Sequence, residues 1–169
     1  MHIDLRLLTG QPCEMASLQR ILEAAPTYTE LVTGHPPAAA DAKSLFSALP
    51  SGMTYDSKYL YGFMTDVPQM VGCADVIRGW PASDTALLGV LLLDGAHQGR
   101  GVGTSGYQQI EAKVRQWPEI DVMRVAVVHS DAAVLPFWRQ VGFAETGEIK
   151  PYVYDTLTSE SIILAKPLR

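Results

Sequence analysis

The sequence is poor in cysteine, lacks any cluster of basic residues and contains no long apolar run. Its two cysteines, Cys13 and Cys73, are far apart and do not have the spacing of a metal site, which favours two reduced thiols in a cytoplasmic protein. Thirteen lysines and arginines against eighteen acidic residues give a formal net charge of −5. Nucleic acid is therefore not an expected partner, because neutralising phosphates requires clustered positive charge.

Membrane insertion and secretion are not expected either. No apolar stretch approaches the roughly 20 residues of a membrane-spanning helix. The first residues, MHIDLRLL, lack the basic stretch and the longer apolar core of a signal peptide. A chain of 169 residues that is 47% hydrophobic and 18% charged suits one folded domain, 1–169, with a single core. We therefore expect a globular cytoplasmic protein.

The most informative segment, 87–116, reads as an apolar strand, a glycine-rich turn and a helix that Thr104 can cap. The glycines that allow the turn to approach a ligand closely are Gly99, Gly101 and Gly103. Such a turn directs several free backbone N–H groups to one point, where the helix dipole favours an anion. Arg100 adds a formal positive charge beside it. The segment therefore predicts a phosphate-binding site.

Two kinds of phosphate-binding turn match these glycines. One is the dinucleotide-binding fingerprint GxGxxG, which Gly101, Gly103 and Gly106 satisfy. That fingerprint belongs to the first strand of its unit, with an acidic residue about 20 positions later at the end of the second strand. Here the turn lies past the middle of the chain, and Asp121 precedes the next strand, which disfavours a nucleotide-binding oxidoreductase. The other is the pattern Gln/Arg-x-x-Gly-x-Gly, which 98–103 satisfy in full.

This six-residue pattern resembles the pyrophosphate loop of the GNAT acyltransferase superfamily, which binds acetyl-CoA. The preceding strand and Asp94 align on that family's strand-to-loop pattern without a gap. Residues 123–143 resemble its second signature, a strand, a helix, an aromatic pair and Gly142-Phe143. The resemblance implies an α/β fold with a mixed, mostly antiparallel central sheet of about seven strands and about four helices. Two parallel strands would splay apart at the CoA cleft.

Hydrophobic periodicity predicts elements that suit this fold. Besides the helix after the turn, helices are expected over 13–24, 41–49 and 132–140, the last starting irregularly or only at Pro136. The segment from Thr27 to Pro37 is expected to be irregular or partly helical. Short connections favour antiparallel pairing in mid-sheet, and the helix after the turn implies a right-handed parallel crossover. The expected strands are 2–8, 58–65, 69–78, 85–93, 122–128, 143–149 and 161–166.

The resemblance also implies which residues hold acetyl-CoA, as a cosubstrate and without a metal. Main chain of the apolar strand would hold the thioester and pantetheine, and the turn would hold the pyrophosphate. The Asn of the family pattern corresponds to Asp131, which can also cap a helix at Ala132. Phe137 and Trp138 are expected to pack beside CoA or in the core. The expected CoA-binding residues are Leu91, Leu92, Leu93, Gln98, Gly99, Arg100, Gly101, Val102, Gly103, Thr104, Asp131, Phe137 and Trp138.

Acetyl transfer to an amine requires a donor that polarises the carbonyl, a base for the amine and an acid for the thiolate. In many GNAT enzymes a tyrosine four residues before the Gly-Phe pair protonates the thiolate. Here that position holds Trp138, whose indole is no practical acid. Replacement candidates are His129, Tyr152 and Tyr154, the tyrosines in a loop or at a strand start, and each also suits a packing or hydrogen-bonding role.

Asp75 is a further catalytic candidate. It is in phase with Val71, Cys73 and Ile77 on an otherwise apolar strand face, so it requires a partner. That partner can be a substrate ammonium, with the carboxylate as base, or a backbone N–H or an arginine such as Arg78. The catalytic candidates are thus Asp75, His129 and Tyr152.

The favoured function is transfer of an acetyl group from acetyl-CoA to a primary amine of a small molecule, by direct attack in a ternary complex. Two alternatives stay open. One is acetylation of a protein N-terminus or lysine; the other is a non-catalytic acyl-CoA-binding sensor or partner domain, which the absent tyrosine favours. The expected partners are acetyl-CoA and an amine-bearing acceptor, with homodimerisation left open.

Overall fold

The structure, a computed structural model, describes all 169 residues. Its strands are β1 (Ile3–Leu7), β2 (Lys58–Thr65), β3 (Met70–Arg78), β4 (Thr85–Leu93), β5 (Val122–Val128), β6 (Ala144–Tyr154) and β7 (Leu157–Pro167). Its α-helices are α1 (Pro12–Glu23), α2 (Pro26–Thr33), α3 (Asp41–Ser47), α4 (Val102–Val114) and α5 (Leu135–Gln140). Three short 3-10 helices are η1 (Tyr55–Ser57), η2 (Gly95–His97) and η3 (His129–Val134). None of these helices has the length and hydrophobicity that crossing a membrane requires.

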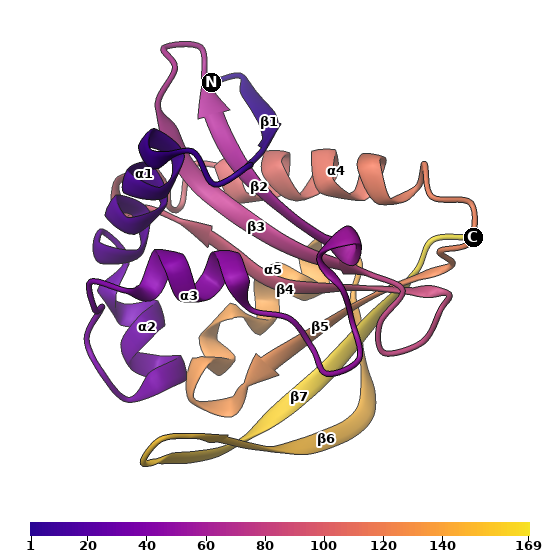
Figure 1. The fold of residues 1–169 in the computed structure, drawn as a ribbon. Coiled ribbons are helices and arrows are strands. Elements are labelled where there is room, and N and C mark those ends of the chain that lie inside the picture. Colours follow the sequence, from indigo (N-terminus) through magenta and orange to yellow (C-terminus); the bar gives the residue numbers. More distant parts are fainter.

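All seven strands form one sheet in the order β1-β2-β3-β4-β5-β7-β6 (Figure 1). Neighbouring strands are antiparallel except β4 and β5, which are parallel and are connected through α4. This confirms the predicted mixed sheet. The structure has five α-helices instead of about four, because Pro26–Thr33 forms a complete helix. That helix begins with a proline in its first turn and ends at Gly34, which has a left-handed φ of 77°.

The two parallel strands separate soon after they begin. Their paired residues are Thr85 with Val122, Ala86 with Met123, and Leu87 with Arg124. Beyond Leu87, β4 keeps its antiparallel partner β3 but has no partner on the β5 side. The main chain of both strands is therefore free to bind a ligand along this edge.

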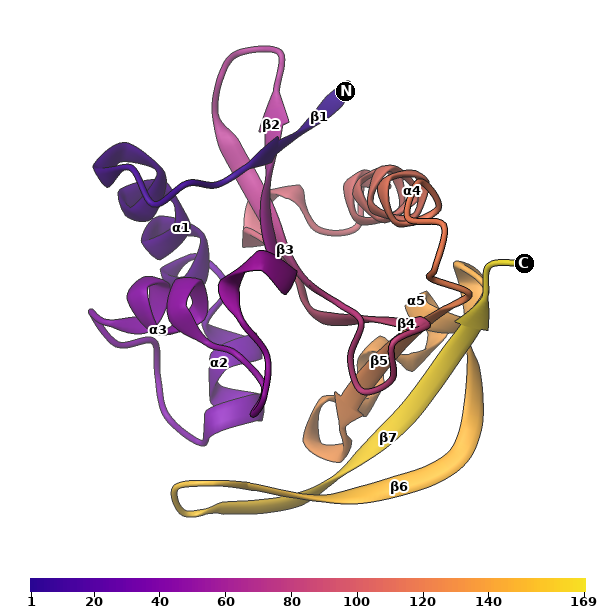
Figure 2. The same cartoon turned by 45° about the vertical axis from the view of Figure 1, so that its right-hand side comes forward.

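Helices cover both faces of the sheet (Figure 2). On one face α4 and α5 pack in a core that contains Tyr107, Ile110 and Trp138. On the other face α1, α2 and α3 pack around a smaller core that contains Leu18 and Ile21. The free edges of β4 and β5 thus lie between two helical layers.

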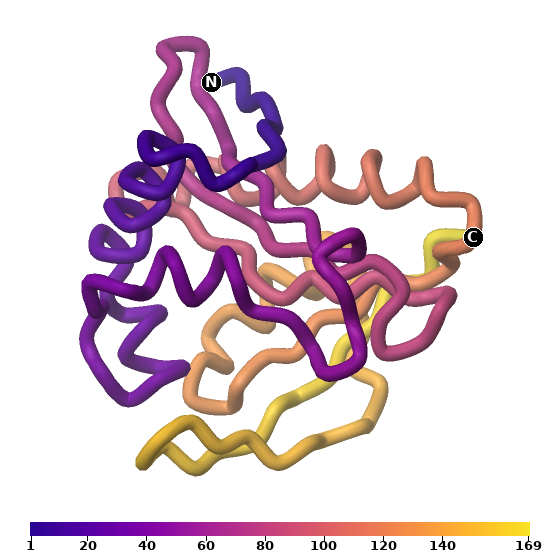
Figure 3. The backbone as a smooth tube through the Cα atoms, viewed as in Figure 1, coloured from indigo at the N-terminus to yellow at the C-terminus, as the bar shows by residue number.

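The β6–β7 hairpin is longer than predicted, and its far end extends toward the part of the chain that forms α2 (Figure 3). Its strands meet in a tight turn at Asp155, whose φ is 50°. The prediction ended the first strand at Ile149, because most β6 side chains are exposed and show no apolar alternation. Tyr152 and Tyr154 therefore lie within β6, which corrects the expected loop or strand start. At the far end, the Tyr152 hydroxyl donates a hydrogen bond of 2.5 Å to the Val32 carbonyl.

The segment after β5 confirms the predicted irregular start of its helix. It forms η3 with a kink at Asp131, where φ is −106° and ψ is 24°, and α5 then begins at Leu135 with Pro136 in its first turn. The Asp131 side chain makes no capping hydrogen bond, so the predicted cap at Ala132 is wrong. The kink breaks the regular geometry that a capping side chain needs.

Close packing around Phe63 depends on residues that lack a side chain. The Phe63 ring is fully buried between β3 and α4. A Cβ atom at Gly106 of α4 would lie 2.8 Å from two atoms of this ring, and one at Gly72 of β3 would lie 2.6 Å from the Leu92 carbonyl oxygen. Gly106 lets α4 pack closely on the Phe63 ring, and Gly72 leaves room in β3 for that ring and for the Leu93 side chain of β4.

We predict that Gly106→Ala lowers the free energy of unfolding by about 1–3 kcal/mol, because the new methyl group overpacks the Phe63 ring. Intrinsic helix propensity alone would give the opposite sign, a gain of about 1 kcal/mol. Urea denaturation measures the change, and Ser105→Ala, one position away in α4, serves as the control with an effect within about 0.5 kcal/mol. The loss should shrink in a Phe63→Leu background. A more stable Gly106→Ala protein would show that the contact is not tight.

Candidate active site

A cavity of about 860 Å³ opens where β4 and β5 separate. Main and side chains of β4 (Leu87 to Leu93) and β5 (Val125 to Val128) form two of its sides. The glycine turn and α5 close one end, and α2 with Tyr152 of β6 close the other. The cavity therefore extends from the predicted phosphate turn to a part lined by Tyr28, Leu31, Val32 and Tyr152, which we call the chamber under α2.

The glycine turn presents unpaired backbone donors. Gly99 and Gly101 have left-handed φ values of 70° and 78°, and Gly101 is the N-cap of α4. The first helical bond runs from the Ser105 N–H to the Gly101 carbonyl at 3.0 Å, and no side chain caps the helix. The amides that precede this bond, which therefore have no helical partner, are those of Val102, Gly103 and Thr104. Thr104 lies inside the first turn of α4, so the prediction that it is the cap is wrong. The N-cap position is occupied by Gly101, in the left-handed conformation.

A buried carboxylate that the sequence analysis assigned no role fixes the start of this turn. Asp94 is 3% exposed and accepts hydrogen bonds from the backbone N–H of His97 at 3.1 Å and from its ring Nδ1 at 2.5 Å. Arg20 of α1 approaches the other Asp94 oxygen at 3.5 Å. Gln98 then donates to the Leu93 carbonyl at 3.1 Å, while Arg100 is exposed and forms no ion pair. The acidic position in the strand-to-loop pattern was the available signal for Asp94.

A bulge in β4 lies at the centre of the cavity. Asp75 of β3 pairs with Val90 and Val76 pairs with Leu88, so Gly89 has no partner in β3. Gly89 is exposed and lines the cavity. The bulge turns the β4 main chain toward the cavity at this point, next to the expected thioester-binding residues Leu91 to Leu93.

Asp75 lies under this bulge and is already paired. Both of its carboxylate oxygens are 2.9 Å from Lys58 Nζ, and the two side chains are 9% and 4% exposed. Arg78, the arginine proposed as a partner, instead pairs with Glu119. Burial raises the pKa of Asp75, although Lys58 opposes the shift. Lys58 therefore compensates the charge of Asp75 within the protein. Asp75 is also not among the residues that line the cavity.

Two tyrosines bring hydroxyl groups to the chamber under α2. Tyr152 lines it, and burial raises the pKa of this phenol. Tyr28 of α2 also lines it and was missed, because nothing in the sequence distinguishes it from a packing residue. Burial raises the pKa of Tyr28, and four ionisable neighbours add to the rise, namely Cys73, Asp131, Tyr152 and Asp75. Both phenols are therefore protonated near neutral pH.

The remaining candidates lie in three different environments. His129 is exposed and is not among the residues that line the cavity. Asp131 is half-buried and lines it, with no hydrogen bond or ion pair, and burial raises the pKa of its carboxyl group. Trp138 is 8% exposed and packs edge-to-face on Tyr107, Phe137 and Phe143, with ring centroids 5.0–6.4 Å apart.

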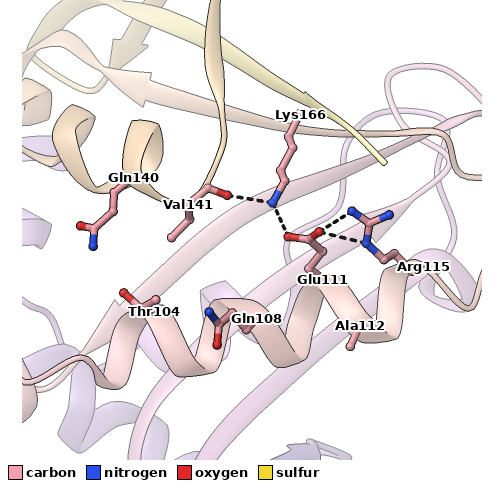
Figure 4. Close-up of a pocket in the computed structure, with 8 residues that line it drawn as sticks. All are labelled: Thr104, Gln108, Glu111, Ala112, Arg115, Gln140, Val141 and Lys166. Carbon is pink, nitrogen blue, oxygen red and sulfur yellow. Dashed lines mark hydrogen bonds and ion pairs between the residues drawn. The ribbon is translucent and has the colours of Figure 1, made fainter. Parts of the chain in front are cut away.

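A second hollow of about 540 Å³ lies between α4, α5 and β7 (Figure 4). Its centre is Glu111, which contacts Lys166 Nζ at 2.5 Å and Arg115 at 2.6 Å. Lys166 also donates to the Val141 carbonyl at 2.8 Å. Two cations and one carboxylate leave a net positive charge here, but both cations are held by Glu111, and this hollow does not include the glycine turn or the free edge of β4. We therefore take the larger cavity as the candidate site.

Comparison with known proteins agrees with this geometry. The family model described as Acetyltransferase (GNAT) family matches residues 18–143, and the chain belongs to this family. One solved structure with the same fold is an acetyltransferase from Thermus thermophilus, with 20% identity, a TM-score of 0.76, and coverage of 99% of this chain and 97% of that chain. No curated protein sequence matches this chain.

Two further solved structures share the fold and contain ligands. A GNAT family acetyltransferase from Elizabethkingia anophelis with acetyl-CoA bound has 14% identity, a TM-score of 0.65 and coverage of 98% of this chain and 97% of that chain. Spermidine N-acetyltransferase from Vibrio cholerae, in complex with CoA and spermine, has 11% identity, a TM-score of 0.74 and coverage of 98% and 95%. At these identities the comparison establishes a common fold.

The Lys58–Asp75 pair gives a prediction for stability. Lys58→Met should cost roughly 3–5 kcal/mol near neutral pH, because it leaves a buried carboxylate without its counter-charge. Loss of Lys58 raises the pKa of Asp75 further, and the penalty applies only to the ionised form. The deficit relative to the wild type should therefore be fully present above the raised pKa and become smaller on acidification from about pH 8 to about pH 5.

Denaturant unfolding at both pH values measures this deficit. The double variant Lys58→Met/Asp75→Leu is the control, since replacing both charges by apolar groups should recover most of the loss. A deficit that is equal at both pH values, or that persists in the double variant, would assign it to packing.

Proposed function

We propose that the protein is an N-acetyltransferase that moves an acetyl group from acetyl-CoA to a primary amine by direct attack in a ternary complex. The observation that carries this proposal is one continuous cavity that connects three features. These are the unpaired amides at the start of α4, the free edge of β4 beyond Leu87, and the chamber under α2. An anionic end of one substrate and the amine of another can approach the same strand from two sides.

The residues at the turn suit acetyl-CoA, which supplies the activated acetyl thioester. The amides of Val102, Gly103 and Thr104 would bind the pyrophosphate, with Gly99 and Gly101 giving the main chain its shape. Gln98 would act by holding the end of β4, because its amide group is bonded to Leu93. Exposed Arg100 would add charge at the rim. Leu91 to Leu93 would contribute main-chain groups, and Phe137 and Trp138 an apolar wall.

An acceptor that arrives as an ammonium first releases one proton to solvent. The neutral amine then forms the C–N bond, the C–S bond breaks, and a second proton leaves nitrogen while one is delivered to the thiolate sulfur. Main-chain N–H groups on the free edge of β4 can polarise the acetyl carbonyl. Tyr152 lines the cavity and its phenol is protonated, so it could act as proton donor and not as base, once its hydroxyl exchanged the hydrogen bond to the Val32 carbonyl for one to the thiolate. No covalent intermediate with the protein is needed. Asp75, paired with Lys58, would lie behind the bulge and contribute little net charge to the reaction.

Ligand-induced stabilisation and turnover test the proposal. Acetyl-CoA at about 100 times its Kd should add about 2.7 kcal/mol to stability, seen as a rise in melting temperature, whereas NAD and ATP should not. CoA release in the presence of primary amines then tests turnover. Stabilisation by acetyl-CoA without CoA release from any amine would favour the non-catalytic sensor, and a larger shift with NAD would contradict the family assignment of the turn.

A matched pair of glycines tests the turn. Gly101 and Gly147 both have left-handed φ values, 78° and 84°, and a Cβ at either would meet no atom within 4 Å. Valine therefore imposes a similar backbone strain at both sites. We predict that Gly101→Val weakens acetyl-CoA binding at least about tenfold, while Gly147→Val in β6 leaves it unchanged. Isothermal titration measures both. Equal affinities would show that Gly101 forms an ordinary turn.

A substitution at the position of the missing tyrosine tests whether Trp138 packs or reacts. Trp138 is held by three aromatic rings, so Trp138→Phe should retain most turnover, with a modest loss in acetyl-CoA affinity or stability. Tyr152→Phe should lower kcat by up to about 100-fold, the lower range for loss of a general acid. Steady-state kinetics with an accepted amine measures both variants. If Trp138→Phe alone abolished turnover in a folded protein with normal acetyl-CoA affinity, the indole would have a direct part in the reaction.

A further inference from the structure

The charged groups that face the cavity are few. It is lined by 28 residues, of which 18 are hydrophobic, and Asp131 is the one residue among them with a charged side chain. No lysine, arginine or histidine lines it. The carboxylate of Asp131 has no hydrogen bond and no ion pair within the protein, although it is half-buried.

Other buried or half-buried carboxylates of this protein are compensated. Asp75 is bound by Lys58, Asp94 by His97 and Arg20, and Glu111 by Lys166 and Arg115. A carboxylate that is partly removed from water loses hydration energy, and in Asp131 no hydrogen bond or ion pair within the protein compensates this loss. Asp131 therefore has an unused capacity to bind a cation that enters the cavity.

Asp131 belongs to η3, and η3 packs against α2. Tyr28 of α2 and Tyr152 of β6 line the same cavity as Asp131. Leu31 and Val32 of α2 give the chamber under α2 apolar walls, and Tyr152, bonded to the Val32 carbonyl, closes it. Ser130, next to Asp131, donates to the Leu31 carbonyl at 2.6 Å, so the main chain beside Asp131 is attached to α2.

We propose that the acceptor is a primary amine with a single positive charge on an apolar, preferably aromatic, body, and that Asp131 binds its ammonium group. The proposal rests on the function proposed above and reassigns Asp131 from CoA to the acceptor. An amino acid is disfavoured, because its carboxylate would meet no cation in the cavity. A polyamine is disfavoured as well, because its further ammonium groups would meet no second carboxylate.

Three amines separate these classes. 2-Phenylethylamine has one charge and an aromatic body, phenylalanine adds a carboxylate to the same skeleton, and spermidine adds charges and lacks the ring. We expect 2-phenylethylamine to have a kcat/KM at least about tenfold above those of the other two. Its binding to the CoA-saturated protein, measured by calorimetry, gives a readout that does not depend on turnover.

Asp131→Asn keeps the shape of the side chain and removes its charge. We expect it to raise the KM and the Kd of 2-phenylethylamine about 10- to 100-fold, as for loss of a hydrogen bond to a charged group, and to leave acetyl-CoA affinity unchanged. Glu30→Gln is the matched control. It removes an exposed carboxylate from α2, beside Leu31 but outside the cavity lining, and should have no effect on either ligand.

The outcomes distinguish this proposal from the proposed function. If acetyl-CoA binds and the enzyme prefers phenylalanine or spermidine, the acceptor class is wrong while the function stands. If Asp131→Asn weakens acetyl-CoA and leaves the amine unaffected, Asp131 is a CoA ligand, as the family pattern implied. If acetyl-CoA does not bind at all, the proposed function fails, and amine binding still shows whether Asp131 recognises a cation.

Discussion

Parallel hydrogen bonding between β4 and β5 ends after Leu87 and Arg124, and the arrangement of the site depends on this separation. A strand in the middle of a sheet normally pairs its backbone groups with two neighbours, whereas β4 beyond Leu87 has only β3. The crossover helix α4 begins just past the end of β4, so its unpaired amides lie at one end of the free edge. Helices pack on both faces of the sheet beside this gap, each layer around its own hydrophobic core.

The bulge at Gly89 adds a second, local constraint. It interrupts the β3–β4 register between Asp75 and Val76, and a Cβ at Gly89 would lie 3.6 Å from an Asp75 oxygen. The carboxylate therefore lies directly behind the part of β4 that faces the cavity. With Lys58 bound to both oxygens, this pair presents little net charge to the reaction. The carboxylate that the sequence analysis considered as a base is thus buried and ion-paired in the structure.

The sequence predicted those parts of the site that are local in the chain. The apolar strand, the glycine turn and the start of α4 are consecutive, and β4 and β5 have the predicted bounds. Tyr28 and Lys58 could not be found in this way, because their roles arise from helix packing and from strand register. Asp75 shows why: the predicted face grouped it with Val71 and Cys73, but a register shift between β2 and β3 places these two in opposite cores. One irregular residue changes which side chains share a face.

The two ends of the cavity differ in the sign of charge that they stabilise. At the turn, amides without acceptors and the N-terminus of α4 favour an anion, and no carboxylate lines that end. Under α2 the sole charged group is the carboxylate of Asp131, among apolar and phenolic side chains. Between them the cavity wall is mostly leucine and valine, which separates the two charges by a region of low polarity. Under the proposed function, a pair of substrates with opposite charges would therefore have one favourable orientation, with the acyl donor at the turn and the amine under α2.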